Sequence, residues 1–348
     1  MKYTSVAALV AALAVSTSFV AASPVLPRQE STASSAATSA ASDASSATST
    51  TDSASSSSSS SSASAAASSS SSTGTSSASS SAASSTSSSS SFNRSSDIDI
   101  LRYALTLENL EAAFYNQSLT NLSAVDFEDA GVNSSYRDQI YSIGQDEAAH
   151  VSLLSFALGN ETLQPCTYNF SSVTDVPSFL ATARLLEGVG ISAYLGALTS
   201  ISNATYQLIA AAITTVESRH QTALNAIAMA PNFVPAPYDT PLNFTEVYSL
   251  AAPYIESCPM DLGLTAFPSL TLTPTNLSMG NSSSNSSSSN TTYYVAFLSG
   301  VVGTRFVELP SNMTVNVPSD ISGGQFYALL THSNSTPITD SRVVAGPA

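Results

Sequence analysis

Basic residues are scarce in this sequence. Lys and Arg together number nine against 24 Asp and Glu, so the formal net charge is −15. Nucleic-acid binding requires a basic surface, and docking on anionic lipid requires one too, so neither partner is expected. The apolar run near the N-terminus is short for a transmembrane span, and no hydrophobic stretch near the C-terminus resembles a lipid-anchor signal. We therefore expect no transmembrane segment.

Cysteine and histidine are also rare. The two cysteines are Cys166 and Cys258, and the histidines number three. Two cysteines are too few for a structural zinc site, which needs four ligands. In an oxidising compartment an even pair most simply forms one disulfide.

The N-terminal residues 1–22 have the pattern of an export signal. Lys2 provides a basic start, residues 6–20 are apolar, and small residues precede an expected cleavage before Ser23. Acceptor motifs for N-glycosylation are frequent, and they include Asn116, Asn133, Asn160, Asn203, Asn243, Asn276 and Asn312. We expect a glycoprotein that is secreted or held in the cell wall.

Residues 23–95 form a low-complexity segment, of which residues 31–91 are almost entirely Ser, Ala and Thr. Such a segment cannot bury enough apolar surface to offset the entropy of ordering it, so we expect a disordered stalk. Dense Ser and Thr in an exported chain favour O-glycosylation. The stalk is a candidate contact for cell-wall polysaccharide.

Helical periodicity begins after Ser96. Apolar residues recur at helical spacing from Ile98 to Phe114, and further helices are predicted at about 135–158, 176–201 and 204–229. A joint of two residues makes the last two helices antiparallel neighbours. Residues 159–174 reach roughly 50 Å at about 3.3 Å per residue, enough to cross a bundle. The pattern predicts an all-α four-helix bundle with one long crossover over residues 96–262.

The remaining residues carry weaker signals. A short helix is predicted at about 243–255, and a low-complexity linker at 263–292 includes the Asn- and Ser-rich run 281–292. Four short strands are predicted at 293–297, 304–309, 314–317 and 325–330. They predict a small β appendage over residues 293–348. A disulfide between Cys166 and Cys258 would join the crossover to the chain after the bundle.

Two of the three histidines stand in the same four-residue frame. Glu147 precedes His150 by three residues, and Glu217 precedes His220 by three. Residues three apart share one face of a helix, so each pair can grip one metal ion. A single Glu-x-x-His frame arises easily by chance, but two of them on predicted bundle helices indicate a metal site.

The two other bundle helices carry a second repeated pattern. Glu108 is followed seven residues later by Tyr115, and Glu187 is followed seven residues later by Tyr194. Seven residues are two helical turns, so each Glu lies on the same stripe as its Tyr. Both Glu residues interrupt apolar sequence, where an unpaired carboxylate is costly without a metal or a proton. The sequence therefore contains the same pair of helices twice: a helix with the Glu and Tyr pattern, followed by a helix with a Glu-x-x-His frame.

These features resemble the di-iron carboxylate proteins, which include ferritins and rubrerythrins and take one Glu from each of two helices and a Glu-x-x-His from each of the others. Within that superfamily the chain resembles fungal secreted ferritin-like proteins of the Rds1 type, described as stress-response proteins. The phrases LENLEAAFY, DEAAHVSLL, LLEGVGISAYLGA and TVESRHQTALNAI carry the resemblance, which covers about residues 97–260. It implies a ferritin-like four-helix bundle.

The resemblance also implies a role for each residue. Glu147 and Glu217 would bridge two metal ions, Glu108 and Glu187 would each bind one, and His150 and His220 would each give one nitrogen. Glu111 is a rival to Glu108, which is preferred because its spacing to Tyr115 is repeated on the third helix. Asp146 would orient the imidazole of a facing helix, and Arg219 would point outward. The metals would be two iron or manganese ions.

Simpler interpretations remain for several residues. Glu111, Asp138 and Glu246 are interpreted as solvated acids on helix faces, and Tyr115 and Tyr194 as core aromatics that support the site without a redox role. Two functions stay open. One is a slow oxidase, ferroxidase or peroxide-removing protein that reacts with dioxygen or peroxide. The other is a non-catalytic glycoprotein of the cell surface or wall with a structural or relict metal site.

Overall fold

The computed structural model describes residues 91–230, 233–272, 277–279, 292–301, 303–321 and 324–348. The predicted export signal, almost all of the predicted stalk and nearly the whole run 281–292 lie outside the described residues. Among the helices of the described ranges, none combines the length and the apolar character that crossing a membrane requires.

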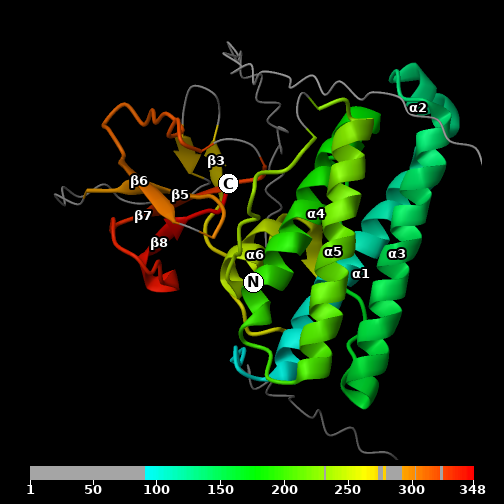
Figure 1. The fold of residues 1–348 in the computed structure, drawn as a ribbon, viewed down its shortest axis with the longest axis horizontal. Helices are drawn as coiled ribbons and strands as arrows, with labels where there is room; N and C mark the ends of the chain where they lie inside the picture. Colours follow the sequence, from blue (N-terminus) through cyan, green and yellow to red (C-terminus); the bar gives the residue numbers. More distant parts are fainter. Residues whose placement is uncertain (1–90, 231–232, 273–276, 280–291, 302, 322–323) are drawn as a thin grey trace, which may run out of the picture. The chain divides into compact units, whose positions relative to one another are not determined.

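Four long helices pack side by side as a bundle (Figure 1). They are α1 (Asp97–Asn121), α3 (Ser134–Leu158), α4 (Val176–Leu198) and α5 (Ala204–Ile227). The predicted four-helix bundle with one long crossover is confirmed. The predicted ends of α4 and α5 were two to three residues too late, because both helices stop before the short polar or Pro-containing segments that follow them.

Side-chain caps fix where the bundle helices begin. Ser96 accepts a hydrogen bond from the backbone N–H of Asp99, and Asp175 forms a reciprocal capping box with Ser178. The Asp97 carboxylate accepts hydrogen bonds from the backbone N–H groups of Ser202 and Asn203, which lie in the turn between α4 and α5. The bond from Ser202 holds the pKa of Asp97 below its usual value. The start of α1 is thereby fixed to the α4–α5 turn.

The crossover between α3 and α4 is tied down at its middle. Strand β1 (Thr167–Tyr168) pairs antiparallel with β2 (Ile255–Ser257), which follows the bundle in sequence. Cys166 and Cys258 lie beside these strands and form a disulfide across 92 residues. The predicted link between the crossover and the chain after the bundle is confirmed.

Replacing both cysteines with serine is expected to lower the free energy of unfolding by about 2–4 kcal/mol, because the disulfide restricts the unfolded chain. Denaturant unfolding of the variant and of the unreduced parent measures the difference. Thiol titration of the unreduced, denatured parent is expected to find no free thiol. Two reactive thiols in that titration would contradict the assignment.

Two short helices flank the bundle. Helix α2 (Ala124–Asp129) was not predicted; Ser123 caps it and Phe127 buries its ring against the bundle core. Helix α6 (Phe244–Ala251) is shorter than the predicted 243–255. Pro253 cannot donate a backbone hydrogen bond, and the chain tightens there into a 3-10 turn (Ala252–Tyr254) before β2 begins.

The C-terminal residues form a four-stranded antiparallel sheet with the order β6-β5-β7-β8. Its strands are β5 (Tyr294–Leu298), β6 (Thr304–Glu308), β7 (Tyr327–Thr331) and β8 (Val343–Ala345). Three predicted strands are confirmed, but the strand predicted at 314–317 is wrong. Residues 314–317 lie between Met313, whose φ is 58°, and Pro318. Few of these residues can therefore join the hydrogen-bond ladder of a β-sheet. Strand β8 takes the fourth place.

The linker predicted at 263–292 also contains structure. Strands β3 (Leu270–Leu272) and β4 (Leu277–Met279) pair antiparallel within it. The backbone N–H of Gly346 donates to the carbonyl oxygen of Pro268, directly before this pair. The described part of this segment is therefore joined to the end of the chain rather than serving only as a spacer.

Candidate metal centre

The four bundle helices bring six predicted ligands to one place. They form two overlapping groups, Glu108, Glu147, His150 and Glu217, and Glu147, Glu187, Glu217 and His220. Within each group one ligand atom per residue lies within 4.8 Å of the others, and all six residues are buried. Each of the four helices contributes, and Glu147 and Glu217 belong to both groups.

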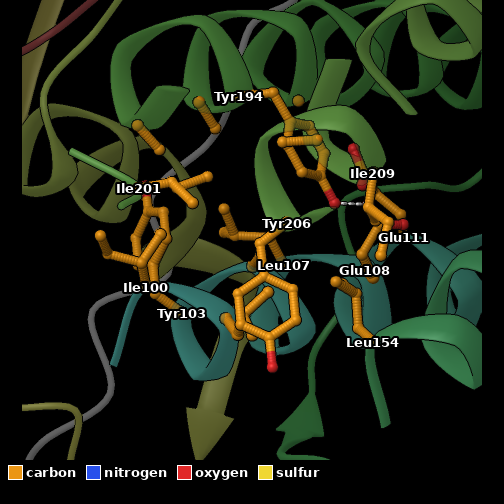
Figure 2. Close-up of a pocket in the computed structure, with 16 residues that line it drawn as sticks. Ile100, Tyr103, Leu107, Glu108, Glu111, Leu154, Tyr194, Ile201, Tyr206 and Ile209 are labelled. Atoms are coloured by element: carbon orange, nitrogen blue, oxygen red, sulfur yellow. Dashed lines mark hydrogen bonds between the residues drawn. The ribbon is translucent and has the colours of Figure 1, made fainter. Parts of the chain in front are cut away.

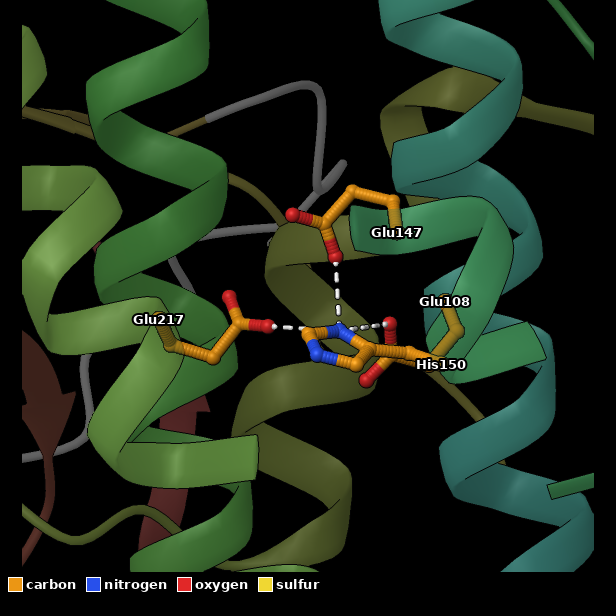
Figure 3. A group of neighbouring side chains, drawn as sticks. All are labelled: Glu108, Glu147, His150 and Glu217. Atoms are coloured by element: carbon orange, nitrogen blue, oxygen red, sulfur yellow. Dashed lines mark hydrogen bonds and ion pairs between the residues drawn. The ribbon is translucent and has the colours of Figure 1, made fainter. Parts of the chain in front are cut away.

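In the first group the carboxylates converge on one imidazole nitrogen (Figure 3). Nδ1 of His150 lies 3.0 Å from Glu147 Oε2 and 3.3 Å from Glu108 Oε2. The distance from Nδ1 to Glu217 Oε1, on the facing helix α5, is also 3.3 Å. One small cation at the place where these atoms meet would contact all four residues.

The second group repeats the arrangement with the other helix pair. Nδ1 of His220 lies 2.9 Å from Glu147 Oε1 and 3.2 Å from Glu187 Oε2. Its other nitrogen, Nε2, lies 3.2 Å from Asp146 Oδ2 on the facing helix α3. Asp146 therefore stands where the sequence placed an orienting residue, and this contact aims Nδ1 of His220 at the carboxylates.

The two tyrosines make hydrogen bonds between helices α1 and α4. Tyr115 of α1 donates its hydroxyl hydrogen to Glu187 of α4, and Tyr194 of α4 donates to Glu108 of α1. Burial raises the pKa of both phenols well above its usual value, so both keep their protons and act as donors. Helix α1 packs closely with α3, and α4 packs closely with α5. Each tyrosine thus fixes a candidate ligand on a helix of the other pair.

Glu111 is a fifth carboxylate at the centre. It was interpreted as a solvated acid, and this interpretation is wrong: the residue is 4% exposed and its pKa is raised well above the usual value, first by burial and then by Glu217. Gly190 makes room for it, since a Cβ there would lie 3.3 Å from Glu111 Oε1 and 3.0 Å from Glu217 Oε2.

The other solvated-acid interpretations have mixed outcomes. For Glu246 the interpretation is wrong: the residue is buried, and its carboxylate accepts from the backbone N–H of Asn243 in the capping box of α6. Asp138 is exposed as expected. Arg219, which lies inside the second Glu-x-x-His frame, is exposed and places no buried cation in the centre.

Several buried carboxylates crowd together at this centre, and it has too little positive charge to balance them. Burial raises the pKa of Glu108 and of Glu217, and for Glu217 the neighbouring Glu147 raises it further. Burial lowers the pKa of both histidines, but contacts with carboxylates outweigh it and raise the values to about 12 for His150 and about 10 for His220. Without another cation, protons have to balance the carboxylates.

The residues fit a pair of divalent metal ions. Four carboxylates in the two groups match the charge of two such ions, and the neutral imidazoles supply nitrogen ligands. Glu217 Oε2 is buried and accepts no hydrogen bond, and Glu217 Oε1 and Glu108 Oε2 have no closer polar partner than Nδ1 of His150, 3.3 Å from each. Buried carboxylate oxygens without donors are suited to a metal ion.

Sequence reasoning missed a contribution from the C-terminal sheet. The hydroxyl of Tyr327 in β7 donates to the backbone oxygen of Gly188, 3.0 Å away. Gly188 directly follows the candidate ligand Glu187 in the sequence. The Tyr327 hydroxyl also lies 2.8 Å from Ser192 Oγ. Gln325 Oε1 accepts from the side chain of Gln221, which follows His220, at 2.9 Å. The sheet therefore contacts α4 and α5 beside two candidate ligands.

Replacing Tyr327 with phenylalanine is expected to lower the free energy of unfolding by about 1–3 kcal/mol, because buried partners lose their hydrogen bonds. Denaturant unfolding measures the change. The half-buried Tyr294 of neighbouring strand β5 provides the matched control, Tyr294→Phe, which is expected to change stability little. Equal effects of the two substitutions would contradict a specific contact between the sheet and α4.

Comparisons with known proteins agree with this architecture. The sequence model of the ferritin-like domain family matches residues 96–230. Protein rds1 of Schizosaccharomyces pombe is 30% identical over 218 residues, which make up 60% of this chain and 53% of rds1. The chain thus spans about half the length of this curated relative. The matched family segment contains every residue of the two candidate ligand groups.

Proposed function

We propose that this chain, whose residues 96–230 match the ferritin-like domain family and which is similar to protein rds1, binds two iron or manganese ions and acts as a slow oxidase or ferroxidase. The overlap of the two ligand groups carries the proposal. Glu147 and Glu217 belong to both groups, which is the arrangement expected of carboxylates that bridge two ions.

The roles proposed for the other residues follow from their contacts. Glu108 and His150 complete one site, and Glu187 and His220 complete the other. The two tyrosines hold the terminal carboxylates, as their hydrogen bonds to Glu108 and Glu187 indicate. Asp146 orients His220. These residues bind and position the metals, and burial of the six ligands and of both tyrosines limits access of water.

Two bound ferrous ions would supply two electrons to dioxygen, which with two protons gives hydrogen peroxide. The histidines are not available as general bases, because their Nδ1 atoms face the metal sites. No serine stands in a nucleophile elbow, so hydrolysis is not proposed. The chain's own part is to hold both ions at a fixed separation in a largely dry core.

We further propose that the protein works outside the cytoplasm. The N-terminal pattern, the Ser-rich segment and the glycosylation motifs support this. The disulfide supports it as well, since disulfides persist in oxidising compartments. The asparagines at 116, 133, 160, 203 and 312 are exposed, as glycan carriers must be.

Oxygen uptake by protein loaded with ferrous ion tests the proposed activity. The parent protein is expected to consume dioxygen faster than the same iron in buffer, and Glu147→Ala/Glu217→Ala is expected to match buffer. Manganese-loaded protein is run beside it to compare the two metals. Metal-loaded parent that consumes no more dioxygen than buffer would overturn the oxidase proposal and favour a non-catalytic surface glycoprotein with a structural metal site.

A further inference from the structure

A polar cleft lies at the C-terminal end of α1 and is separate from the apolar hollow that ends at the candidate ligand Glu108 (Figure 2). It has a volume of about 230 Å³, which is far more than one water molecule needs and less than a drug-sized ligand needs. The volume suits one pyranose ring with its substituents. The residues that line the cleft come from the end of α1 and from the crossover, and they are Gln117, Ser118, Asn121, Leu122, Phe170, Ser171 and Val173.

The walls of this cleft are amphipathic. Three of the lining side chains are apolar, and the other four carry an amide or a hydroxyl group. Phe170 and Val173 are half-buried, so part of each side chain can contact an occupant. A pyranose has the same two characters, because its C–H faces pack on apolar side chains and its hydroxyl groups form hydrogen bonds. The chemistry of the walls therefore fits a sugar.

Ser118 has an unsatisfied hydroxyl group beside the cleft. Its Oγ atom is buried and has no hydrogen-bond partner among the described residues. Ser142 of α3 and Ser192 of α4 donate to the backbone oxygen four residues earlier, and Ser118 does not. A buried hydroxyl group without a partner is costly, so a polar occupant that reaches it is favoured.

Hydrogen bonds hold both sides of the cleft in place. Arg137 of α3 donates to the backbone oxygens of Leu119 and Leu122, which fixes the end of α1. On the crossover, the backbone N–H of Val173 donates to the backbone oxygen of Phe170 and closes a turn. The cleft is therefore formed without an occupant, and little free energy is spent on ordering it.

Asn121 carries an acceptor motif for N-glycosylation, because Leu122 and Ser123 follow it. It is exposed and is the last residue of α1. Helical side chains tilt toward the N-terminus of their helix, so a group attached to Asn121 lies over the preceding turn, which holds Gln117 and Ser118. An N-linked sugar on this asparagine is therefore directed onto the cleft.

We infer that the first N-acetylglucosamine of an N-linked glycan on Asn121 occupies this cleft and holds the crossover against α1. The inference rests on the proposed location outside the cytoplasm and does not involve the metal centre. The donor is a lipid-diphosphate-linked oligosaccharide. Nδ2 of Asn121 bonds to C1 of the sugar, the bond from C1 to the diphosphate breaks, and the lipid diphosphate leaves with the proton from Nδ2. Attachment gives the sugar an effective concentration at which even a weak site stays filled.

Mass spectrometry of glycopeptides tests the attachment in full-length protein from a eukaryotic host. Asn121 is expected to carry N-acetylglucosamine, and so are the exposed Asn133 and Asn160. Glycans on those two with none on Asn121 would overturn the inference and leave the proposed location intact. Absence of glycans from all three would overturn both.

Hydrogen exchange tests whether the sugar lies in the cleft. Asn121→Gln removes the glycan, and the backbone amide of Val173 is expected to exchange severalfold faster because its turn loses the packed sugar. Asn116 is exposed on the same helix, has an acceptor motif and does not line the cleft. Asn116→Gln is therefore the matched control, with no change expected. Equal exchange in the parent and in Asn121→Gln would refute the inference, and that is the result if a glycan on Asn169 fills the cleft instead.

Protein from a bacterial host that forms the disulfide but attaches no such glycan separates the sugar from the substitution. In that protein the Val173 amide is expected to exchange equally fast in the parent and in Asn121→Gln. Slower exchange in that parent would assign the effect to the asparagine itself and contradict the inference. In the glycosylated parent, enzymatic trimming to a single N-acetylglucosamine is expected to preserve slow exchange, and complete removal is expected to abolish it. Loss of slow exchange on trimming would rule out the first sugar as the occupant.

Discussion

Replacing both Glu147 and Glu217 with alanine is expected to abolish metal binding at both sites. Each of these carboxylates belongs to both ligand groups, so neither group keeps more than two of its four residues. Loss of half of the ligands, including both candidate bridges, leaves too few donors for a tightly held ion. Titration with ferrous ion under anaerobic conditions, followed by calorimetry, measures the loss.

The double variant is expected to stay folded, because removing buried like charges offsets part of the cost of lost volume. The exposed acids Glu128 and Asp138 provide a control with the same change in net charge, Glu128→Ala/Asp138→Ala. This control is expected to bind metal as the parent does. Normal binding by Glu147→Ala/Glu217→Ala would refute the ligand assignment.

The stability of the metal-free protein is expected to fall as the pH rises from about 5 to about 9. Burial raises the pKa values of Glu108, Glu111 and Glu217, and contacts with carboxylates raise those of His150 and His220 to about 12 and about 10. A group whose pKa is raised on folding binds more protons in the native state than in the unfolded chain. Its contribution is complete below the unfolded pKa and is lost as the pH approaches the folded pKa.

Thermal unfolding at several pH values, with and without metal, measures this dependence. The loaded protein is expected to show the opposite trend, because metal binding displaces protons and strengthens as the pH rises. Glu246, whose pKa burial raises to about 7, contributes a smaller fall that persists in Glu147→Ala/Glu217→Ala. The slope of that variant should therefore be shallower than the slope of the parent. Metal-free stability that is constant or rises over this range would contradict the account.

The sequence predicted the bundle well, because its helices carry strong local signals. Capping residues such as Ser96 and Asp175 mark the starts, and apolar periodicity marks the faces. Glu147, His150, Glu217 and His220 were proposed as ligands from spacing, because two residues three apart on a helix share a face. Glu108 and Glu187 were proposed from the seven-residue spacing that each has to a tyrosine and from the family resemblance. Tyr115 and Tyr194 were placed near the site, but their partners on the opposite helix pair depend on packing that the sequence does not encode locally.

The errors concern burial and long-range contacts. Glu111 stands on α1 three residues after Glu108, and its carboxylate is buried where α4 approaches closely at Gly190. The contact of Tyr327 with Gly188 joins residues 139 positions apart, and the apolar periodicity of the sequence does not predict such a contact. The strand predicted at 314–317 had suitable composition but lies beside a left-handed residue and a proline. Propensity alone could not resolve any of these cases.

Metal content tests the central claim most directly. Full-length protein is incubated anaerobically with ferrous or manganous salt, freed of unbound metal by gel filtration, and analysed by elemental mass spectrometry. The two overlapping ligand groups predict close to two ions per chain. A value close to zero with both metals, in protein that is folded and has its disulfide intact, would contradict the account.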